Sequence, residues 1–358
     1  MVVIIDAVAK TVSCAKPHQL TFTKRSQELP LTSTSQSRPV TAGPLTLTGT
    51  EPFFMVLNTG SGKRDSNAIE ETIKSVLNQA NRDYQLFKVD RGADLQGAAE
   101  HATQMAREND GIVVAVGGDG TLNAVCQSVV GQGVPFGILP QGTFNYFGRA
   151  HGISQNTEQA IEALLNARIE PISVGELNGH YFLVNASLGL YPRLLEDREV
   201  FKQRYGRSRL VALWSAVVTL AKAHRQLQVV LEHGGQAQQL RTPTLVVFNN
   251  ALQLEHVGLQ PQVAPHIDHL IATTARPVGT LALYGLLVRG LLSRMGDAEN
   301  VNSFGFETLT VRTDRPSKRV KVAMDGEIFH MHTPLTFRLA AHALPLLIPR
   351  SAPPPEHP

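Results

Sequence analysis

The sequence predicts two domains: an α/β domain built on a parallel sheet, followed by a β-rich antiparallel sandwich domain. In the first half, apolar strand-like runs alternate with helix-like segments, which is the pattern of a parallel sheet with helices on its faces. From about residue 172, short apolar runs follow one another between turn residues, as in an antiparallel sandwich or barrel. The length of 358 residues also exceeds one ordinary core and suits two domains.

The elements of the first half follow from their apolar patterns. Strand-like runs are FFMVLN, YQLFKV, IVVAV and PFGIL, at residues 53–58, 84–89, 112–116 and 135–139. Helical patterns lie between and after them, at residues 66–80, 95–109 and 121–130. The carboxyl ends of parallel strands meet at one edge of a sheet, so a ligand is expected at the loops that follow these strands.

The second half contains mainly short strands. The runs that predict them are YFLVNASLGL, LQVVLEHGGQAQQL, TPTLVVFNN, LIATTAR, TLTVRT and VKVAMDGEIF. Two helical runs, at residues 209–225 and 281–295, interrupt the strands. Both are apolar enough to be core helices, although their basic ends also suit contact with a membrane surface.

The folded body is expected between residues 52 and 349. Residues 1–51 include a stretch rich in Ser, Thr and Pro and are predicted to be a disordered extension, and residues 350–358 a tail of the same kind. We assign residues 52–171 to the α/β domain and residues 172–335 to the β-rich domain.

Composition excludes several classes of protein. A net charge of +3 without clustered basic stripes does not support nucleic-acid binding. No apolar run is long enough for a transmembrane helix, and Asp6 interrupts the apolar start that a secretory signal would need. Cys14 and Cys126 form no CxxC pair, so neither a disulfide framework nor a zinc site is indicated, and a reducing cytoplasm is expected.

Three glycine-bearing loops follow the strands of the first half: NTGSGKRD, GGDGTLN and LPQGTFNYFGR, at residues 58–65, 117–123 and 139–149. Glycine turns before a helix favour phosphate, because free backbone N–H groups and the positive helix end attract an anion. Asp119 beside a phosphate would be repulsive unless a metal ion or a proton lies between them.

Neither of the two common phosphate-binding motifs fits these loops. Leu57 and Arg64 stand where a P-loop needs glycine and a hydroxyl residue. The third glycine of the dinucleotide fingerprint would fall at Asn123.

The order of the loops resembles the diacylglycerol kinase catalytic-domain family, which includes bacterial soluble lipid kinases and the sphingosine and ceramide kinases, and is more distantly related to NAD kinases. Four segments carry the resemblance: NTGSG at 58–62, GGDGT at 117–121, LPQGTFN at 139–145 and DGE at 325–327. It spans roughly residues 53–349, and GGDGT followed by PxGTxN is its specific part. It also implies that the last strand, about residues 336–349, returns to the first domain.

The resemblance implies that a nucleotide lies between the two domains, with its phosphates held by the glycine loops. The candidate nucleotide-binding residues are then Asn58, Ser61, Gly62, Gly117, Gly118, Gly120, Thr121, Asn123, Gly142, Thr143 and Asn145. Asp119 is expected to organise Mg²⁺, and Glu327 to accept the proton of the attacking hydroxyl, with Asp325 as second choice for that base. Phosphoryl transfer needs these parts, namely charge neutralisation, in-line positioning and a base, more than a covalent nucleophile.

The chain departs from the family at three places. Thr59 stands where proline is usual and keeps the turn plausible, while Tyr146 replaces the acidic residue that usually follows the asparagine of the third loop. Many bacterial members bind a structural Mg²⁺ through an Asp-Gly-Leu segment. Here Asp268 is retained as a candidate metal ligand, but His269 takes the place of the glycine.

The resulting hypothesis is an ATP-dependent, Mg²⁺-requiring lipid kinase with diacylglycerol as the default acceptor and phosphatidic acid as product. Such an enzyme is expected in the cytoplasm, meeting its lipid peripherally at a membrane surface, without nucleic acid and without a transmembrane segment; a homodimer is left open. Sphingoid bases, ceramide-like lipids or monoacylglycerols fit the motifs equally well, because acceptor choice lies in the apolar lining of the second domain.

Two alternatives to a lipid kinase are kept. One is a nucleotide-binding regulatory module without catalysis. The other is an NAD kinase, which shares GGDGT but usually carries an NE-[DN] motif where this chain has LPQGTFNYFGR.

Overall fold

The computed structural model describes residues 46–60, 66–205, 226–249, 269–275, 301–313 and 319–350. The helices predicted at 209–225 and 281–295 lie outside the described residues. So do three candidate site residues, Ser61, Gly62 and Asp268.

Four parallel strands form one end of a ten-stranded sheet, in the order β2-β1-β3-β4. They are β1 (Phe53–Asn58), β2 (Tyr84–Val89), β3 (Ile112–Gly117) and β4 (Phe136–Pro140). The helices are α2 (Ser66–Gln79), α3 (Leu95–Glu108) after a short 3-10 turn η1 (Gly92–Asp94), α4 (Asp119–Val129), α5 (Tyr146–Ala150) and α6 (Thr157–Leu165). These bounds confirm the predicted strands and helices of the first half to within two residues.

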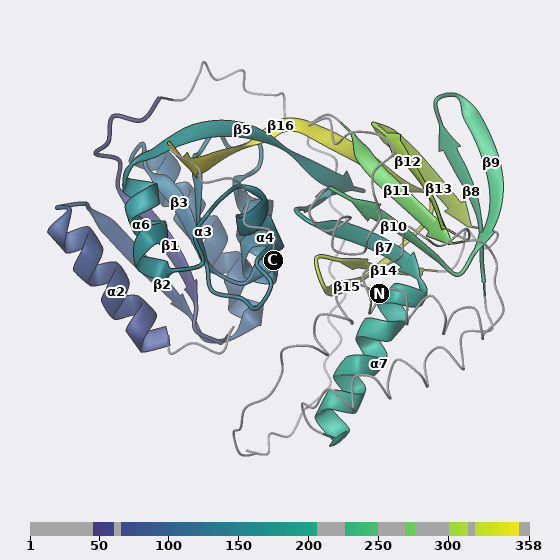
Figure 1. The fold of residues 1–358 in the computed structure, drawn as a ribbon, viewed down its shortest axis with the longest axis horizontal. Coiled ribbons are helices and arrows are strands. Elements are labelled where there is room, and N and C mark those ends of the chain that lie inside the picture. The colour runs from purple at the N-terminus through teal and green to yellow at the C-terminus, as the bar shows by residue number, and fades with distance from the viewer. Residues whose placement is uncertain are drawn as a thin grey trace.

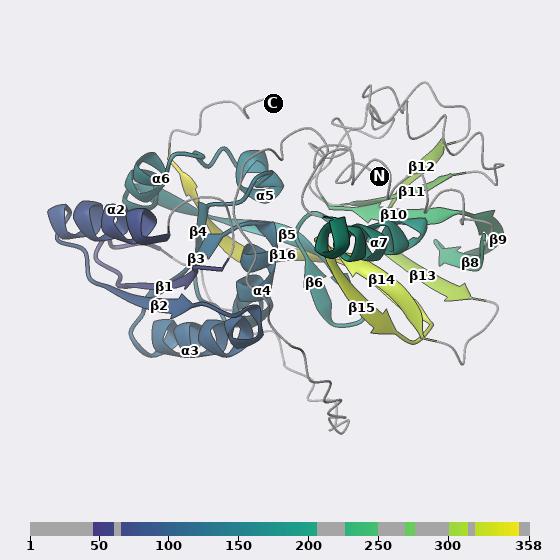
Figure 2. The same ribbon diagram turned by 90° about the horizontal axis from the view of Figure 1, so that it is seen from below.

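Helices cover both faces of this parallel sheet. Figure 2 shows α2 and α6 on one side of it and α3 on the other, and α4 packs against α3. Every residue of β3 is buried, as its unbroken apolar sequence requires in a strand covered on both faces. The carboxyl ends of β1, β3 and β4 remain at one edge of the layered structure.

The second domain is a sandwich of two antiparallel layers. One layer is a six-stranded sheet in the order β12-β11-β10-β7-β14-β15, and the other is the far end of the larger sheet. The strands of the smaller sheet are β7 (Asn185–Gly189), β10 (Thr244–Phe248), β11 (Leu270–Ala275), β12 (Val301–Phe306), β14 (Val320–Met324) and β15 (Glu327–Met331). Facing it are β6 (His180–Phe182), β8 (Leu227–His233), β9 (Gln236–Thr242) and β13 (Thr308–Thr313), and helix α7 (Leu190–Tyr205) follows β7.

An apolar core fills the space between the two layers of the sandwich. Leu188 and Val247 of the smaller sheet are fully buried in the same cluster as Val311 and Phe337 of the larger one. The structure therefore confirms the predicted fold class, a parallel α/β domain followed by an antiparallel sandwich.

Two long strands, β5 (Ala167–Leu177) and β16 (Leu335–Pro349), run side by side from one domain to the other, as Figure 1 shows. The first residues of β16 pair with β13, and its last residues lie beside β4, where Leu346 is level with Phe136. The β5–β16 register shifts between Ala340 and Leu344. The larger sheet is thus continuous through both domains.

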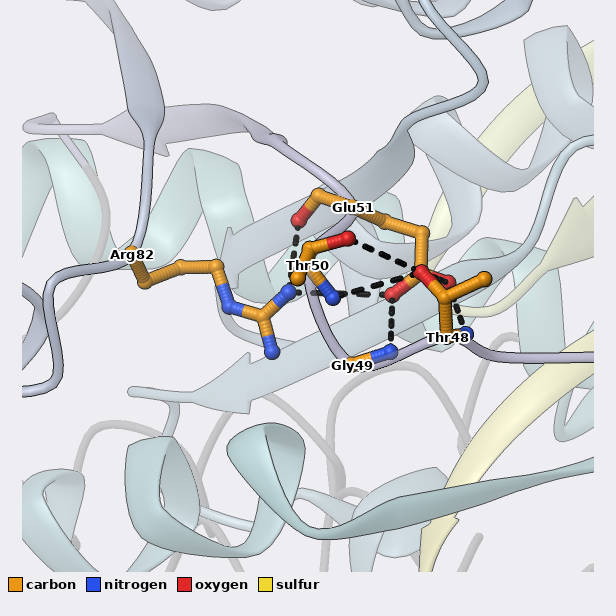
Figure 3. Close-up of polar contacts among 5 residues, drawn as sticks. All are labelled: Thr48, Gly49, Thr50, Glu51 and Arg82. Atoms are coloured by element: carbon orange, nitrogen blue, oxygen red, sulfur yellow. Dashed lines mark hydrogen bonds and ion pairs between the residues drawn. The ribbon is translucent and has the colours of Figure 1, made fainter.

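A short turn before β1 is tied to the first domain (Figure 3). The carboxylate of Glu51 accepts hydrogen bonds from the backbone N–H of Thr48 and from its hydroxyl, the latter at 2.9 Å. Arg82 donates from Nη1 to the carbonyl of Glu51 at 3.0 Å, and its guanidinium lies 5.0 Å from the ring centre of Phe53. The predicted extension, residues 1–51, therefore overlaps residues that are hydrogen-bonded to the folded domain.

Candidate active site

Three loops meet at the carboxyl edge of the parallel sheet, after β1, β3 and β4. Asn58 donates from Nδ2 to Oγ1 of Thr121 at 3.0 Å, which connects the first loop to the second. The backbone N–H of Gln141 donates to the carbonyl of Gly117 at 2.8 Å, which connects the third loop to the second. The structure thus brings the described residues of all three predicted loops together.

The second and third loops touch backbone to backbone at Gly118 and Gly142. A Cβ on Gly142 would lie 2.8 Å from Cα of Gly118 and 2.6 Å from Oδ1 of Asn145. A Cβ on Gly117 would lie 2.5 Å from the side chain of Thr121. Glycine is therefore needed at these positions, and it leaves backbone rather than side chains at the N-terminus of α4, where helix N–H groups favour an anion.

Asn145 shapes the third loop from within. Its φ of 51° lies in the left-handed region, which asparagine tolerates better than most residues. Its Oδ1 accepts the N–H of Gly142 at 2.8 Å, and its Nδ2 donates to the carbonyl of Gly142 at 3.1 Å. These bonds commit the side chain to the loop, whereas Thr143 is exposed on the loop surface.

Asp119 is the first residue of α4 and faces the N-terminus of α5. Its two oxygens accept the backbone N–H groups of Tyr146 and Phe147, each at 3.3 Å. The pKa of Asp119 is raised to about 6, because burial, with the negative charge of Asp325 added to it, outweighs the lowering effect of the backbone hydrogen bonds from Phe147 and its neighbours. Long hydrogen bonds and a raised pKa describe a carboxylate whose charge is only partly compensated by the protein.

Asp325 occupies the turn of the hairpin between β14 and β15. It has φ of 46° and Gly326 has φ of 92°, which fits a two-residue turn of the type that prefers Asp-Gly. Its carboxylate accepts three backbone N–H groups at 2.7–2.9 Å, from Leu183, Val184 and Asn185. Asn123 of α4 donates a fourth hydrogen bond across the domain boundary. Asp325 therefore joins the hairpin to the rest of the molecule.

Glu327 is the residue after this turn and lies at the start of β15. A Cβ on Gly120 would lie 3.8 Å from Oε1 of Glu327, so the carboxyl of Glu327 reaches the second glycine loop. Partial burial raises the pKa of Glu327, and the charge of Asp325 adds to the increase. The residue is exposed, unlike Asp325, and none of the described hydrogen bonds or ion pairs involves its carboxyl.

Asn123 does not face the three loops. Its Nδ2 donates to Asp325 and, at 3.1 Å, to the carbonyl of Tyr181, both in the second domain, and its Oδ1 accepts a hydrogen bond from Gln127 of the same helix. Gln127, one turn further along α4, contacts the same strand, and it was not identified from the sequence. A polar residue four positions after Asn123 is the signal that could have indicated it.

Known proteins resemble the chain over both domains. The family model described as "Diacylglycerol kinase catalytic domain" matches residues 52–177. A Staphylococcus haemolyticus protein named "Putative lipid kinase" is 37% identical over 243 residues, which cover 66% of this chain and 76% of that protein. The "Diacylglycerol kinase" of Bacillus subtilis is 37% identical over 106 residues, or 28% of this chain, which span about a third (35%) of that relative.

A solved structure shares the fold. The crystal structure of a "putative diacylglycerol kinase" from Bacillus anthracis str. Sterne superposes with a TM-score of 0.65 at 20% identity, covering 86% of this chain and 100% of that one. At this identity the likeness supports the fold alone.

Fold and site together define a two-domain kinase. The chain belongs to the diacylglycerol kinase catalytic-domain family and is a lipid kinase, which confirms the resemblance seen in its loops. Membership of a kinase family implies that ATP is the phosphoryl donor. Among the helices of the described residues, none is long and apolar enough to cross a membrane.

Proposed function

We propose that this protein transfers the γ-phosphate of ATP to the free hydroxyl of diacylglycerol and so produces phosphatidic acid. The observation that carries the proposal is the approach of Glu327, from the second domain, to Gly120 of the glycine loop in the first. The names of several relatives support diacylglycerol as the acceptor. Because this lipid resides in membranes, we propose that the enzyme meets it at a membrane surface.

Glu327 is the general base of the proposed reaction. Its carboxylate takes the proton of the lipid hydroxyl while the hydroxyl oxygen forms a bond to the γ-phosphorus. The bond from that phosphorus to the oxygen bridging the β- and γ-phosphates breaks, and ADP leaves. The raised pKa of Glu327 suits this role, because a carboxylate of higher pKa accepts a hydroxyl proton more readily.

Asp325 is the weaker candidate for the base. Its oxygens already accept three backbone N–H groups and the amide of Asn123, so fewer lone pairs are left for a substrate proton. We therefore assign Asp325 to holding the hairpin that carries Glu327.

Asp119 fits the role of Mg²⁺ ligand. No group of three or more His, Cys, Asp or Glu side chains within the described ranges could enclose a metal ion. Mg²⁺ needs no such cage, since in kinases one or two carboxylates and the nucleotide phosphates hold it. The hydrogen bonds that Asp119 accepts from the N–H groups of Tyr146 and Phe147 are long, at 3.3 Å each, and a carboxylate has about four lone-pair sites, so its oxygens retain capacity for a cation. When bound, Mg²⁺ would neutralise phosphate charge during transfer.

The test is transfer of radiolabelled γ-phosphate from ATP, with Mg²⁺, to a panel of micellar lipids by the wild type, Glu327→Gln and the control Glu307→Gln. Glu307 is an exposed carboxylate of the same domain. We expect labelled phosphatidic acid from the wild type and the control, and a kcat lower by about 10²–10⁴-fold in Glu327→Gln, the usual contribution of a general base.

Three results would contradict parts of the proposal. A wild type that labels sphingoid bases and not diacylglycerol has a different acceptor. Normal turnover by Glu327→Gln would show that Glu327 is not the general base. Undiminished turnover in EDTA would show that the reaction does not need Mg²⁺.

A further inference from the structure

The polar face of α4 carries three residues spaced one turn apart, Asp119, Asn123 and Gln127. Residues four apart on a helix are neighbours on one face, so the three form a row along α4. Asp119 stands at the end of the row beside the glycine loops, and Asn123 and Gln127 extend the row along the domain boundary.

Gln127 pairs with the backbone of a single residue in the second domain. Its Oε1 accepts the N–H of Tyr181 at 2.9 Å, and its Nε2 donates to the carbonyl of Tyr181 at 2.7 Å. A side-chain amide thus satisfies both peptide groups of Tyr181, in the way that a neighbouring strand would. Tyr181 belongs to β6, two residues before Leu183, the first of the three residues whose N–H groups bind Asp325.

Gln127 also fixes the orientation of Asn123. Its Nε2 donates to Oδ1 of Asn123 at 2.7 Å, so the oxygen end of the Asn123 amide faces Gln127. The Nδ2 end is left to donate to Asp325. With the Asn123 amide reversed, its oxygen would face the carboxylate of Asp325, and two acceptors would then oppose each other.

We propose that Gln127 is a positioning residue for phosphoryl transfer: through Asn123 and Tyr181 it holds the Asp325 turn, and that turn sets Glu327 against the glycine loop. The inference rests on the proposed role of Glu327 and adds a residue that touches no reacting group. A displacement of Asp325 would be transmitted directly to Glu327, because only Gly326 separates the two residues in the chain.

Kinetics of Gln127→Leu and Gln127→Glu test the proposal. Gln127→Leu removes both polar groups of the amide. Gln127→Glu keeps an oxygen that can accept the N–H of Tyr181, but it loses the N–H group that donates to Oδ1 of Asn123. A displacement of about 1 Å at a reacting group can lower turnover by about 10²-fold. We expect kcat to fall by about that factor in both variants while the Kd for ATP stays within about threefold, because the glycine loops are unchanged.

Gln104→Leu is the matched control. Gln104 lies on the neighbouring helix α3 and makes a similar hydrogen bond four residues along its own helix, to Glu108 at 2.8 Å. It has no described contact with the second domain, so kcat should not change. The kcat of the double variant, Gln127→Leu with Asn123→Ala, should be no lower than that of the slower single variant. The reason is that Gln127 and Asn123 act through the same chain of contacts.

Amide hydrogen exchange gives a readout that does not need turnover. In Gln127→Leu the N–H groups of Leu183, Val184 and Asn185 should exchange about tenfold faster, while those of β3 do not change. A kcat within twofold of the wild type in Gln127→Leu overturns the inference. If the wild type phosphorylates no lipid, the proposed function is wrong, whatever the role of Gln127. In that case the exchange data alone decide the inference, and unchanged exchange at residues 183–185 in Gln127→Leu overturns it.

Discussion

At the scale of single residues, the carboxylates of the site differ in how fully the protein satisfies them. Asp325 accepts three backbone hydrogen bonds at 2.7–2.9 Å, whereas the oxygens of Asp119 accept two at 3.3 Å. Burial raises the pKa of both, and for Asp119 the value reaches about 6. A half-buried charge with weak partners costs free energy of folding, and this cost is typical of groups that act on a ligand.

Asp119→Asn tests that cost through the pH dependence of stability. The pKa of Asp119 is higher in the folded protein, about 6, than its ordinary value of 3.8. Its contribution to stability is therefore fully present below about pH 4 and is lost as the pH rises to about 6. Asparagine does not titrate, so Asp119→Asn should gain stability relative to the wild type across this interval.

Urea midpoints of the two proteins between about pH 4 and pH 7.5 measure the effect. Asp94→Asn is the control, because Asp94 is an exposed partner of Arg91. A difference between wild type and Asp119→Asn that does not change with pH would show that the carboxylate is not strained by burial. Lipid phosphorylation should be lost in Asp119→Asn under all these conditions.

At the scale of elements, the first half of the chain was predictable because each strand is a short apolar run that ends at a turn. The strands and helices of the second half were less predictable from the sequence. Strand β5 contains Pro171, which argues against a strand, and α7 was missed because its sequence, LYPRLLEDREVFKQRY, has many charges and an early proline.

The features of the site also divide into those that local sequence predicts and those that it does not. The glycine loops can be assigned from local sequence, since each follows its own strand. The hydrogen bond between Asn123 and Asp325 joins residues 202 positions apart, and no local pattern indicates it. For the same reason the sequence did not separate the role of Asp325 from that of Glu327, which stand in one DGE segment but have different surroundings.

Gly142→Ala tests the close contact between the second and third loops. The added Cβ would lie 2.6 Å from Asn145 and 2.8 Å from Gly118, so one loop must move. We expect a loss of about 1–3 kcal/mol in unfolding free energy, as for other overpacked sites. Weaker ATP binding should accompany it, and both can be measured by urea unfolding and calorimetric titration.

Gly97→Ala is the control for this substitution. A Cβ at Gly97 meets nothing within 4 Å, and the residue lies in helix α3. Alanine should stabilise that helix by up to about 1 kcal/mol and leave ATP binding unchanged. Equal ATP affinity in Gly142→Ala and the wild type would mean that the contact between the loops has no part in binding.

At the scale of the whole molecule, β5 and β16 make the two domains parts of one sheet. β16 pairs with β13 in the sandwich and lies beside β4 in the parallel sheet. The second connection is the Asp325 turn, which α4 holds from the other domain. Because sheet pairing and hydrogen bonding both cross the boundary, neither domain has a complete set of contacts alone.

We therefore predict that the two domains unfold together. Gly175→Ala places a Cβ 2.2 Å from the ring of Phe182, within the connecting strand region. It should lower the urea midpoint by the same amount for β3 in the first domain and β10 in the second, measured by hydrogen exchange at increasing urea. Gly92→Ala, where a Cβ meets nothing within 4 Å, should change neither. Loss of protection in one domain alone would contradict the prediction.

The position of β16 also affects how the chain folds while it is being made. The first domain lacks its neighbour for β4 until residues 335–349 have left the ribosome, although β4 itself ends at residue 140. At about 5–20 residues per second, the delay is on the order of 10–40 s. During that time the β4 edge of the apolar sheet has no neighbouring strand, and an unpaired edge of this kind can pair with other chains.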